Sequence, residues 1–179
     1  MGEKRSVCVF CGSASGHGHQ YAREAERLGG EVARRGLRLV YGAGNVGLMG
    51  VLANAALRQG GEVVGVIPEA LMGREVCHQG LTRLHVVRTM HERKALMADL
   101  SDLFLALPGG YGTLDEMFEV LTWAQLGIHR KPVGLANVGG YFTPLLDWVS
   151  QAAREGFLSD SHLGLLLVEE DPVRLLDRA

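Results

Sequence analysis

The sequence predicts a single-domain α/β protein with a parallel β-sheet that is covered by helices on both faces. Short apolar runs alternate with amphipathic helical patterns along the whole chain. Gly-rich turns separate several of the runs from the helices that follow them. The 179 residues are close to the usual size of one domain, and no linker, repeat or low-complexity tract divides them.

The first half of the chain predicts strands that alternate with helices. Apolar residues at helical spacing predict one helix from about Tyr21 to Gly36, and a second from the turn at 42–47 to about Gln59. Each helix would return the chain to the start of the next strand, which is the connection that parallel strands need. The expected strands cover residues 6–11, 37–41, 62–67 and 83–87.

The second half of the chain repeats this pattern. Strands are expected at 103–107, 133–136 and 165–168, and helices at 90–100, 113–125, 142–155 and the C-terminal end. In sheets of this kind, ligands bind beyond the carboxyl ends of the strands. The Gly-rich turns that follow the apolar strands are therefore the expected positions of a binding site.

Composition excludes several kinds of protein. The formal net charge of −2 gives no general affinity for nucleic acid or for an anionic membrane, so we expect neither as a partner. No apolar run is long enough to cross a bilayer, and residues 1–5 lead into the first strand without a signal-peptide core. The odd number of cysteines, 3, does not suggest a disulfide framework. These features favour a soluble protein of the reducing cytoplasm.

The strongest motif is the glycine-rich segment at residues 108–116, which follows a buried strand and opens a helix. Glycines let backbone N–H groups approach an anion closely, and a helix start adds unpaired donors and partial positive charge. The segment therefore predicts a phosphate-binding turn. The alternative interpretation is a capping box formed by Thr113 and Glu116, although a capping box needs no glycines before it.

A second motif places cationic and apolar side chains on one face of a helix. Met90, Arg93, Lys94 and Met97 share this face at helical spacing. Such a mixed face suits the wall of a pocket that holds an anionic ligand. The alternative is that Arg93 and Lys94 extend past the methionines into solvent.

A third motif, at residues 41–50, matches the G-x-G-x-x-G pattern of dinucleotide-binding turns. It follows the second expected strand, whereas the dinucleotide fold uses the turn after the first. It is therefore weak support for NAD. The motif is better explained by a second place where the backbone approaches a ligand, or by close packing of a helix on a strand.

Other candidates for metal or cofactor chemistry are weak. Cys8 and Cys11 would lie on opposite faces of an extended strand, and no second pair follows, so a zinc site is not expected. His17 and His19 lack an accompanying carboxylate cluster and fit a polar loop. Of the lysines only Lys94 lies in a candidate site, which gives little support to a pyridoxal-phosphate Schiff base.

Four motifs occur together and in order: Val9-Phe10-Cys11-Gly12-Ser13; Val40-Tyr41-Gly42-Ala43-Gly44 with Gly47-Leu48-Met49-Gly50; Met90-His91-Glu92-Arg93-Lys94; and Pro108-Gly109-Gly110-Tyr111-Gly112-Thr113 with Glu116. From Val7 to about Phe157 the chain resembles the LOG (Lonely Guy) family of cytokinin riboside 5′-monophosphate phosphoribohydrolases, whose members have also been described as lysine decarboxylases. Two positions depart from the family pattern. Ala43 stands where the family often has Gly, and Asp115 stands where Glu is common.

The resemblance implies a Rossmann-like doubly wound fold, a homodimer or an assembly of dimers, and neither a metal nor an organic cofactor. It makes Arg93 and Glu116 the expected catalytic pair. Taken with the motifs, it gives the residues expected to bind the substrate, which are Gly12, Ser13, Gly44, Glu75, Met90, Arg93, Lys94, Gly109, Gly110, Tyr111, Gly112, Thr113, Leu114, Asp115, Glu116 and Thr122.

The expected reaction is cleavage of the N-glycosidic bond of a nucleoside 5′-monophosphate, which releases a free base and ribose 5-phosphate. Its transition state carries positive charge on the ribose, as in glycoside hydrolysis, and Glu116 would stabilise that charge or position water. Arg93 would anchor the ribose or the phosphate and keep Glu116 ionised by proximity. Two alternatives stay open: a general AMP nucleosidase, and a non-catalytic carrier that holds a nucleotide or a pterin cofactor.

Overall fold

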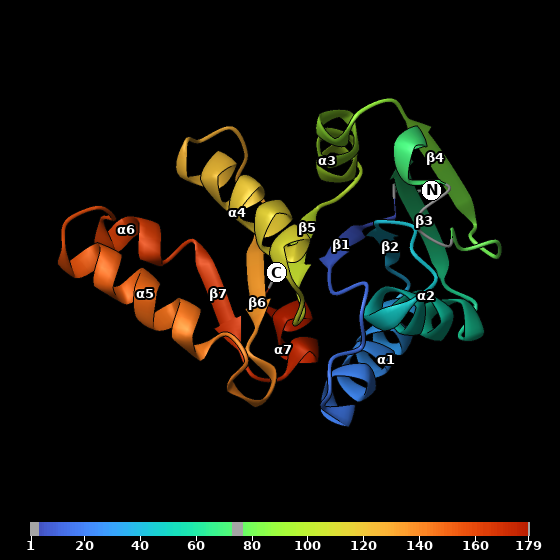
Figure 1. Cartoon of the computed structure of the whole chain (residues 1–179), viewed down its shortest axis with the longest axis horizontal. Coiled ribbons are helices and arrows are strands. Elements are labelled where there is room, and N and C mark those ends of the chain that lie inside the picture. Colours follow the sequence, from blue (N-terminus) through green and yellow to red (C-terminus); the bar gives the residue numbers. More distant parts are fainter. Residues whose placement is uncertain (1–3, 73–76, 179) are drawn as a thin grey trace.

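A computed structural model of the chain describes residues 4–72 and 77–178 and shows one parallel sheet with helices around it (Figure 1). The strands of the described residues are β1 (Ser6–Phe10), β2 (Arg38–Tyr41), β3 (Glu62–Pro68), β4 (Arg83–Val87), β5 (Leu103–Ala106), β6 (Val133–Ala136) and β7 (Leu166–Glu169). They form one sheet in the order β4-β3-β2-β1-β5-β6-β7, and each neighbouring pair is parallel. The predicted fold class is confirmed.

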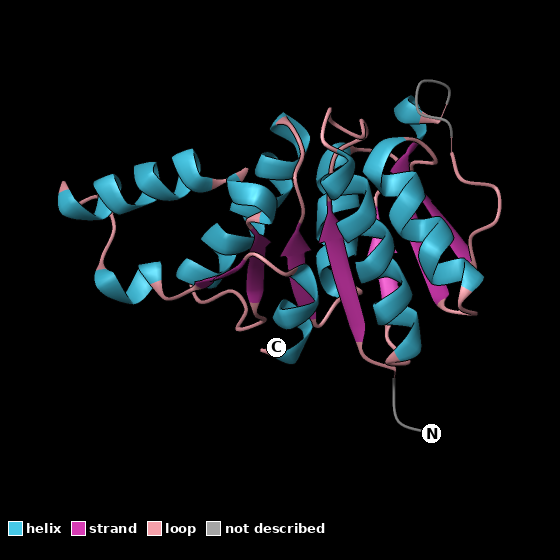
Figure 2. Ribbon diagram, turned by 90° about the horizontal axis from the view of Figure 1, so that it is seen from below, coloured by secondary structure: helices cyan, strands magenta, loops and turns pink. Residues whose placement is uncertain are grey.

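Helices cover both faces of this sheet, as the ribbon in Figure 2 also shows. One face carries α1 (His19–Arg34), α2 (Gly47–Arg58) and α7 (Pro172–Asp177). The other face carries α3 (Met90–Asp99), α4 (Tyr111–Gln125) and α5 (Thr143–Arg154). The chain also forms the short helix α6 (Asp160–Leu163), which the sequence did not predict, and the single 3-10 turns Glu69–Leu71 and Val138–Gly140.

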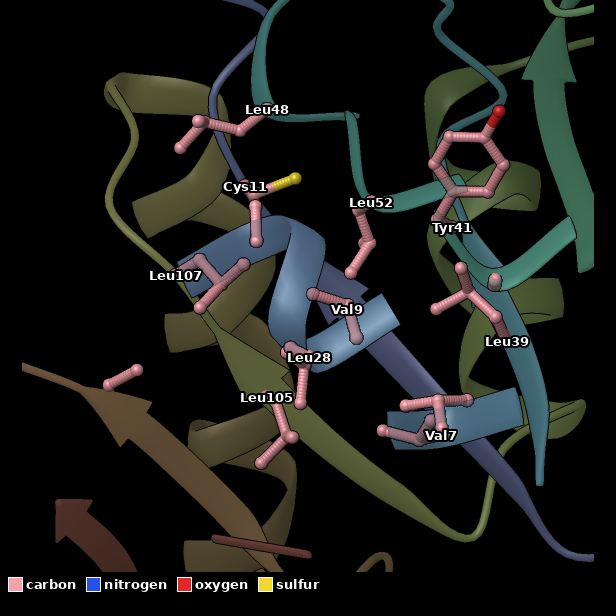
Figure 3. Packing of buried hydrophobic residues seen from close by; sticks show 14 of the residues in the cluster. Val7, Val9, Cys11, Leu28, Leu39, Tyr41, Leu48, Leu52, Leu105 and Leu107 are labelled. Carbon is pink, nitrogen blue, oxygen red and sulfur yellow. The ribbon is translucent and has the colours of Figure 1, made fainter. Parts of the chain in front are cut away.

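The alternation of side chains along β1 builds two cores. Val7 and Val9 point toward the α1 and α2 side, where they join Leu28 and Leu39 (Figure 3). Cys8 points to the opposite face and joins the core under α3 and α4. All residues of β1 are buried, as expected for the central strand of a sheet that is covered on both faces.

The direction of winding reverses between β1 and β5. The chain runs outward from β1 to β4 and then returns to place β5 on the other side of β1. Such a switch point opens a crevice at the carboxyl ends of the two strands. Backbone hydrogen bonds from Gly12 N to Pro108 O (3.0 Å) and from Leu107 N to Phe10 O (2.9 Å) join the two strand ends. The glycine-rich segment at 108–116 therefore lies beside this crevice.

The start of α4 differs from the sequence prediction. The helix begins at Tyr111, two residues before the expected start, and its N-cap is Gly110, which provides no side-chain hydrogen bond. Thr113 is the third residue of the helix, so the capping box of Thr113 and Glu116 is wrong. The glycines before the helix consequently need another explanation.

A capping box begins α3 instead. The side chain of its N-cap, Thr89, accepts a hydrogen bond from Glu92 N (3.1 Å). The Glu92 carboxylate in turn accepts one from the N–H of Arg88 (2.9 Å), the residue before the N-cap, which gives a variant of the capping box. This start fixes where Arg93 lies on the helix.

Helix α5 differs from the other long helices because none of its residues is buried. Its Trp148 is 56% exposed, and Phe157, just beyond its end, is 83% exposed.

Within the ranges 4–72 and 77–178, no helix has the length and apolar character that a bilayer crossing requires.

Candidate active site

A cavity of about 330 Å³ lies at the carboxyl ends of β1, β2 and β5, where the switch-point crevice is expected. It brings together residues from all four of the motifs that carry the family resemblance. Its lining consists of Val9, Cys11, Gly12, Ser13, Gly42, Met49, Arg93, Gly110, Tyr111, Gly112, Thr113 and Glu116.

Arg93 forms one wall of the cavity and is fixed by the ends of two strands. Its Nε donates to Val66 O (3.1 Å) in the carboxyl-terminal half of β3, and its Nη2 donates to Gly42 O (3.1 Å) just after β2. The side chain is only 7% exposed. Arg93 therefore does not extend into solvent, and two of its donors are held by carbonyl groups of the sheet.

Gly42 makes this position of Arg93 possible. A Cβ atom on residue 42 would lie 2.0 Å from Nη2 of Arg93, which is far inside van der Waals contact. The carbonyl of the same residue accepts the hydrogen bond from that nitrogen. The first glycine of the G-x-G-x-x-G pattern thus makes room for a protein side chain.

Glu116 faces Arg93 from α4. Its Oε1 lies 3.9 Å from Nη1 of Arg93, and its side chain is 14% exposed. Attraction between opposite charges at this distance is strong in a largely buried site. The pair therefore places one carboxylate and one guanidinium side by side in the cavity.

The thiol of Cys11 also lines the cavity, and it stays protonated. Burial raises its pKa far above the usual value, and the nearby Glu116 carboxylate raises it further. A thiol in this state is a poor nucleophile. Cys8, the other cysteine near β1, points to the opposite face of the sheet from Cys11, as predicted.

The glycines at the start of α4 fall into two groups. A Cβ on Gly109 would lie 2.0 Å from Oγ1 of Thr113 and 2.9 Å from Gly12 N, so Gly109 serves close packing. A Cβ on Gly110 or Gly112 would meet no atom within 4 Å, and neither glycine has a positive φ. Both glycines line the cavity, and the first N–H groups of a helix have no partner within it, so this helix start is suited to an anion.

The second glycine-rich turn serves packing. Gly47 has a φ of +60°, and a Cβ there would lie 2.3 Å from Ser13 O. The N–H of Leu48 also donates to Gly12 O (3.0 Å). Close packing of α2 on the loop after β1 therefore accounts for Gly47, whereas Gly42 and Met49 of the same motif line the cavity.

Ala43, in the same turn, is fully buried with a φ of +65°. This left-handed conformation favours glycine, which is the residue that the family often has there.

Several residues expected to bind the substrate lie outside the cavity lining. Gly44 bridges to Cys77, Met90 places its Sδ 3.6 Å from Arg93 Nη1, and Lys94 pairs with acidic residues of α4. Thr122 lines a different groove, beside α5. Glu75 lies outside the described residues. The others that do not line the cavity are Gly109, Leu114 and Asp115.

Four lining residues were not among the expected substrate contacts: Val9, Cys11, Gly42 and Met49. All four belong to motifs that were quoted for the family resemblance. Val9 and Cys11 lie at the carboxyl end of β1, Gly42 directly follows β2, and Met49 lies in the first turn of α2.

The fold and the site define a doubly wound α/β protein whose cavity joins a carboxylate–guanidinium pair to a glycine-rich helix start. The family model described as "Possible lysine decarboxylase" matches residues 49–179. The chain belongs to this family, the LOG family, as its similarity to named members shows.

Two relatives illustrate the similarity. The cytokinin riboside 5′-monophosphate phosphoribohydrolase of Rhodococcoides fascians is 55% identical over 168 residues, which cover 93% of this chain and 85% of the relative. Cytokinin riboside 5′-monophosphate phosphoribohydrolase LOG of Oryza sativa subsp. japonica is 52% identical over 163 residues, 89% of this chain and 67% of the relative.

Among solved structures, the molybdenum cofactor carrier protein of Chlamydomonas reinhardtii is similar, with a TM-score of 0.75. The match covers 98% of this chain and 96% of that chain at 21% identity. At this identity the likeness shows a common fold.

The contact between Gly42 and Arg93 predicts the effect of one methyl group. Gly42→Ala forces the guanidinium off its carbonyl partners, so the free energy of unfolding should fall by about 1–3 kcal/mol. Urea denaturation measures this change. Gly30→Ala is the matched control, because the nearest atom to its Cβ, Gln59 Cγ, is 3.8 Å away. Equal stability of the two variants would contradict the account.

Proposed function

We propose that this chain hydrolyses the N-glycosidic bond of nucleoside 5′-monophosphates, with N6-modified adenosine monophosphates such as cytokinin riboside 5′-monophosphates as substrates. The observation that carries the proposal is the position of Glu116, which shares α4 with the open helix start and lies 3.9 Å from Arg93. The names of the relatives from Rhodococcoides fascians and Oryza sativa support the same reaction.

The start of α4 is the proposed phosphate site. The backbone N–H groups of the first turn lack partners within the helix, and the helix dipole adds partial positive charge there. Gly110 and Gly112 leave space in front of these groups. Glu116 comes five residues after Tyr111, about 7.5 Å further along the axis, which suits a ribose attached to the bound phosphate.

Glu116 is the proposed catalytic carboxylate. When the bond between C1′ and the base nitrogen breaks, positive charge develops on the ribose ring, and a carboxylate beside C1′ stabilises it. The same carboxylate is placed to position a water molecule for attack on C1′. Because Arg93 is held by two backbone carbonyl groups, it provides a fixed positive charge 3.9 Å from the Glu116 carboxylate.

The lysines do not support a lysine decarboxylase that forms a Schiff base. Such an enzyme needs a lysine amine at its cofactor site. Lys4 pairs with Glu62 (3.8 Å), Lys131 donates to Ala98 O (2.8 Å), and Lys94 pairs with carboxylates of α4. These are all the lysines of the sequence, and none of them lines the cavity.

Two further expectations belong to this proposal. We place the protein in the cytoplasm, supported by the cysteines Cys8, Cys11 and Cys77, which are all free and buried.

We expect the site to work without a bound metal. In the described part of the chain, no group of three or more His, Cys, Asp or Glu side chains is placed to hold one.

We also propose that the protein forms a homodimer through the face that carries α5. An apolar groove of about 480 Å³ lies between α4 and α5, and its lining includes Phe118, Leu121 and Trp148. None of the α5 residues is buried within the chain, although the helix has a distinct apolar side. A second copy of the chain would cover this apolar surface.

Glu116→Gln tests the catalytic role. The amide keeps the size of the side chain but cannot act as an anion or a base, so base release should fall at least about hundredfold. The assay is chromatography of the free base after incubation with isopentenyladenosine 5′-monophosphate and, in parallel, AMP. Circular dichroism checks that the fold is retained. Base release at the wild-type rate would remove Glu116 from the mechanism, and AMP binding without any base release by the wild type would favour a carrier.

Gly112→Ala tests the phosphate site. The added methyl group enters space that is empty of protein atoms, so the helix should keep or gain stability, by up to about 1 kcal/mol. The same methyl group obstructs a bound phosphate, so the KM for the monophosphate should rise about tenfold or more. Gly30→Ala in α1 serves as the control, with a similar effect on stability and an unchanged KM. An unchanged KM for Gly112→Ala would remove the phosphate from this position.

Trp148→Glu tests the dimer. A charge on the α5 face should convert the dimer to a monomer, because burial of an unpaired charge at an interface is costly. Light scattering coupled to size-exclusion chromatography measures the mass. Val86→Glu is the control, since Val86 is also apolar and 45% exposed but lies on edge strand β4. A wild-type monomer, or a Trp148→Glu dimer, would contradict this interface.

A further inference from the structure

The ammonium group of Lys94 lies between two carboxylates of the neighbouring helix. Its Nζ is 3.2 Å from Oδ2 of Asp115 and 3.0 Å from Oε2 of Glu119. The Lys94 side chain is 11% exposed and that of Glu119 is 24% exposed, so this ion pair is partly shielded from water, whereas Asp115 is 59% exposed. It joins α3 to α4 directly beside the cavity.

The residues involved form two adjacent pairs. Arg93 and Lys94 follow each other on α3, and Asp115 and Glu116 follow each other on α4. Because consecutive helical residues point about 100° apart, each helix can send one side chain into the cavity and the next one away from it. Arg93 and Glu116 line the cavity, and Lys94 and Asp115 do not.

From this geometry we infer that Lys94 is a positioning residue, whose ion pairs with Asp115 and Glu119 hold α3 against α4 and so set the separation of Arg93 and Glu116. The inference rests on the proposed hydrolase function and assigns Lys94 a role other than substrate contact. Glu119 is not among the site residues that were predicted from the sequence.

The charges at this position support the role. One ammonium group faces two carboxylates, so the local net charge is negative and would repel a phosphate group. Burial acts to lower the pKa of Lys94, but the nearby carboxylates of Glu119 and Asp115 outweigh it and raise the pKa. The ammonium therefore stays charged and committed to these partners.

The position of the ion pairs explains why they matter for catalysis. The ion pair between Arg93 and Glu116 spans 3.9 Å, whereas the contacts of Lys94 are 3.0 and 3.2 Å. The shorter pairs fix the two helices next to the longer pair. A displacement of about 1 Å at a catalytic group can cost up to about a hundredfold in rate, so a modest movement of α4 would be costly.

A double-mutant cycle tests this inference. The variants are Lys94→Met, the pair Asp115→Asn with Glu119→Gln, and all three changes combined. Each of the first two should lower kcat for isopentenyladenosine 5′-monophosphate about tenfold and change KM less than threefold. The combined variant should be no slower than either one, because all three changes remove the same interaction. Lys94→Arg keeps the ion pairs and should retain most of the wild-type kcat.

Other outcomes separate the alternatives. If Lys94 contacts the substrate, Lys94→Met will raise KM strongly, while the acid substitutions leave both constants near wild type, and the inference is overturned. Additive losses of kcat would overturn it as well. If Lys94→Met does not fold, Glu119→Gln alone, which keeps Lys94 and Asp115, must still lower kcat. An inactive wild type would instead overturn the proposed function itself.

Discussion

The structure depends on a buried guanidinium that is held by the ends of two strands. Burying a charge without partners is unfavourable, and Arg93 avoids this cost by donating to the carbonyl groups of Val66 and Gly42. One carbonyl group belongs to β3 and the other directly follows β2, so the sheet itself fixes the cation. The position of the charge in the cavity is therefore as rigid as the core of the protein, and Glu116 faces a preorganised partner.

The other half of the site is built into one helix. A helix start offers N–H donors and partial positive charge, and residues further along the helix lie at fixed distances from it. On α4 the open glycine positions come first and Glu116 follows in the second turn. A phosphate bound at the start would bring its attached ribose toward the carboxylate, because one rigid element carries both groups. The family membership of the chain is consistent with this arrangement.

Local patterns in the sequence predict the parallel sheet, because alternation of apolar runs and helices is itself local. Contacts between distant segments are not visible in such patterns. The segments at Thr89–Glu92 and Thr113–Glu116 have the same capping pattern, yet only the first caps a helix, since Gly110 starts α4 earlier. Arg93 and Lys94 lie on the same predicted face, but their partners on β2, β3 and α4 direct one into the cavity and the other away from it.

The central claim is that a phosphate held at the start of α4 places the anomeric carbon beside Glu116. The most direct test compares kcat/KM of the wild-type protein for isopentenyladenosine 5′-monophosphate and for isopentenyladenosine, which differ only in that phosphate. Binding energy from the phosphate should be used to orient the ribose, so the account predicts a preference of at least about a hundredfold for the monophosphate. Equal values for the two substrates would contradict it.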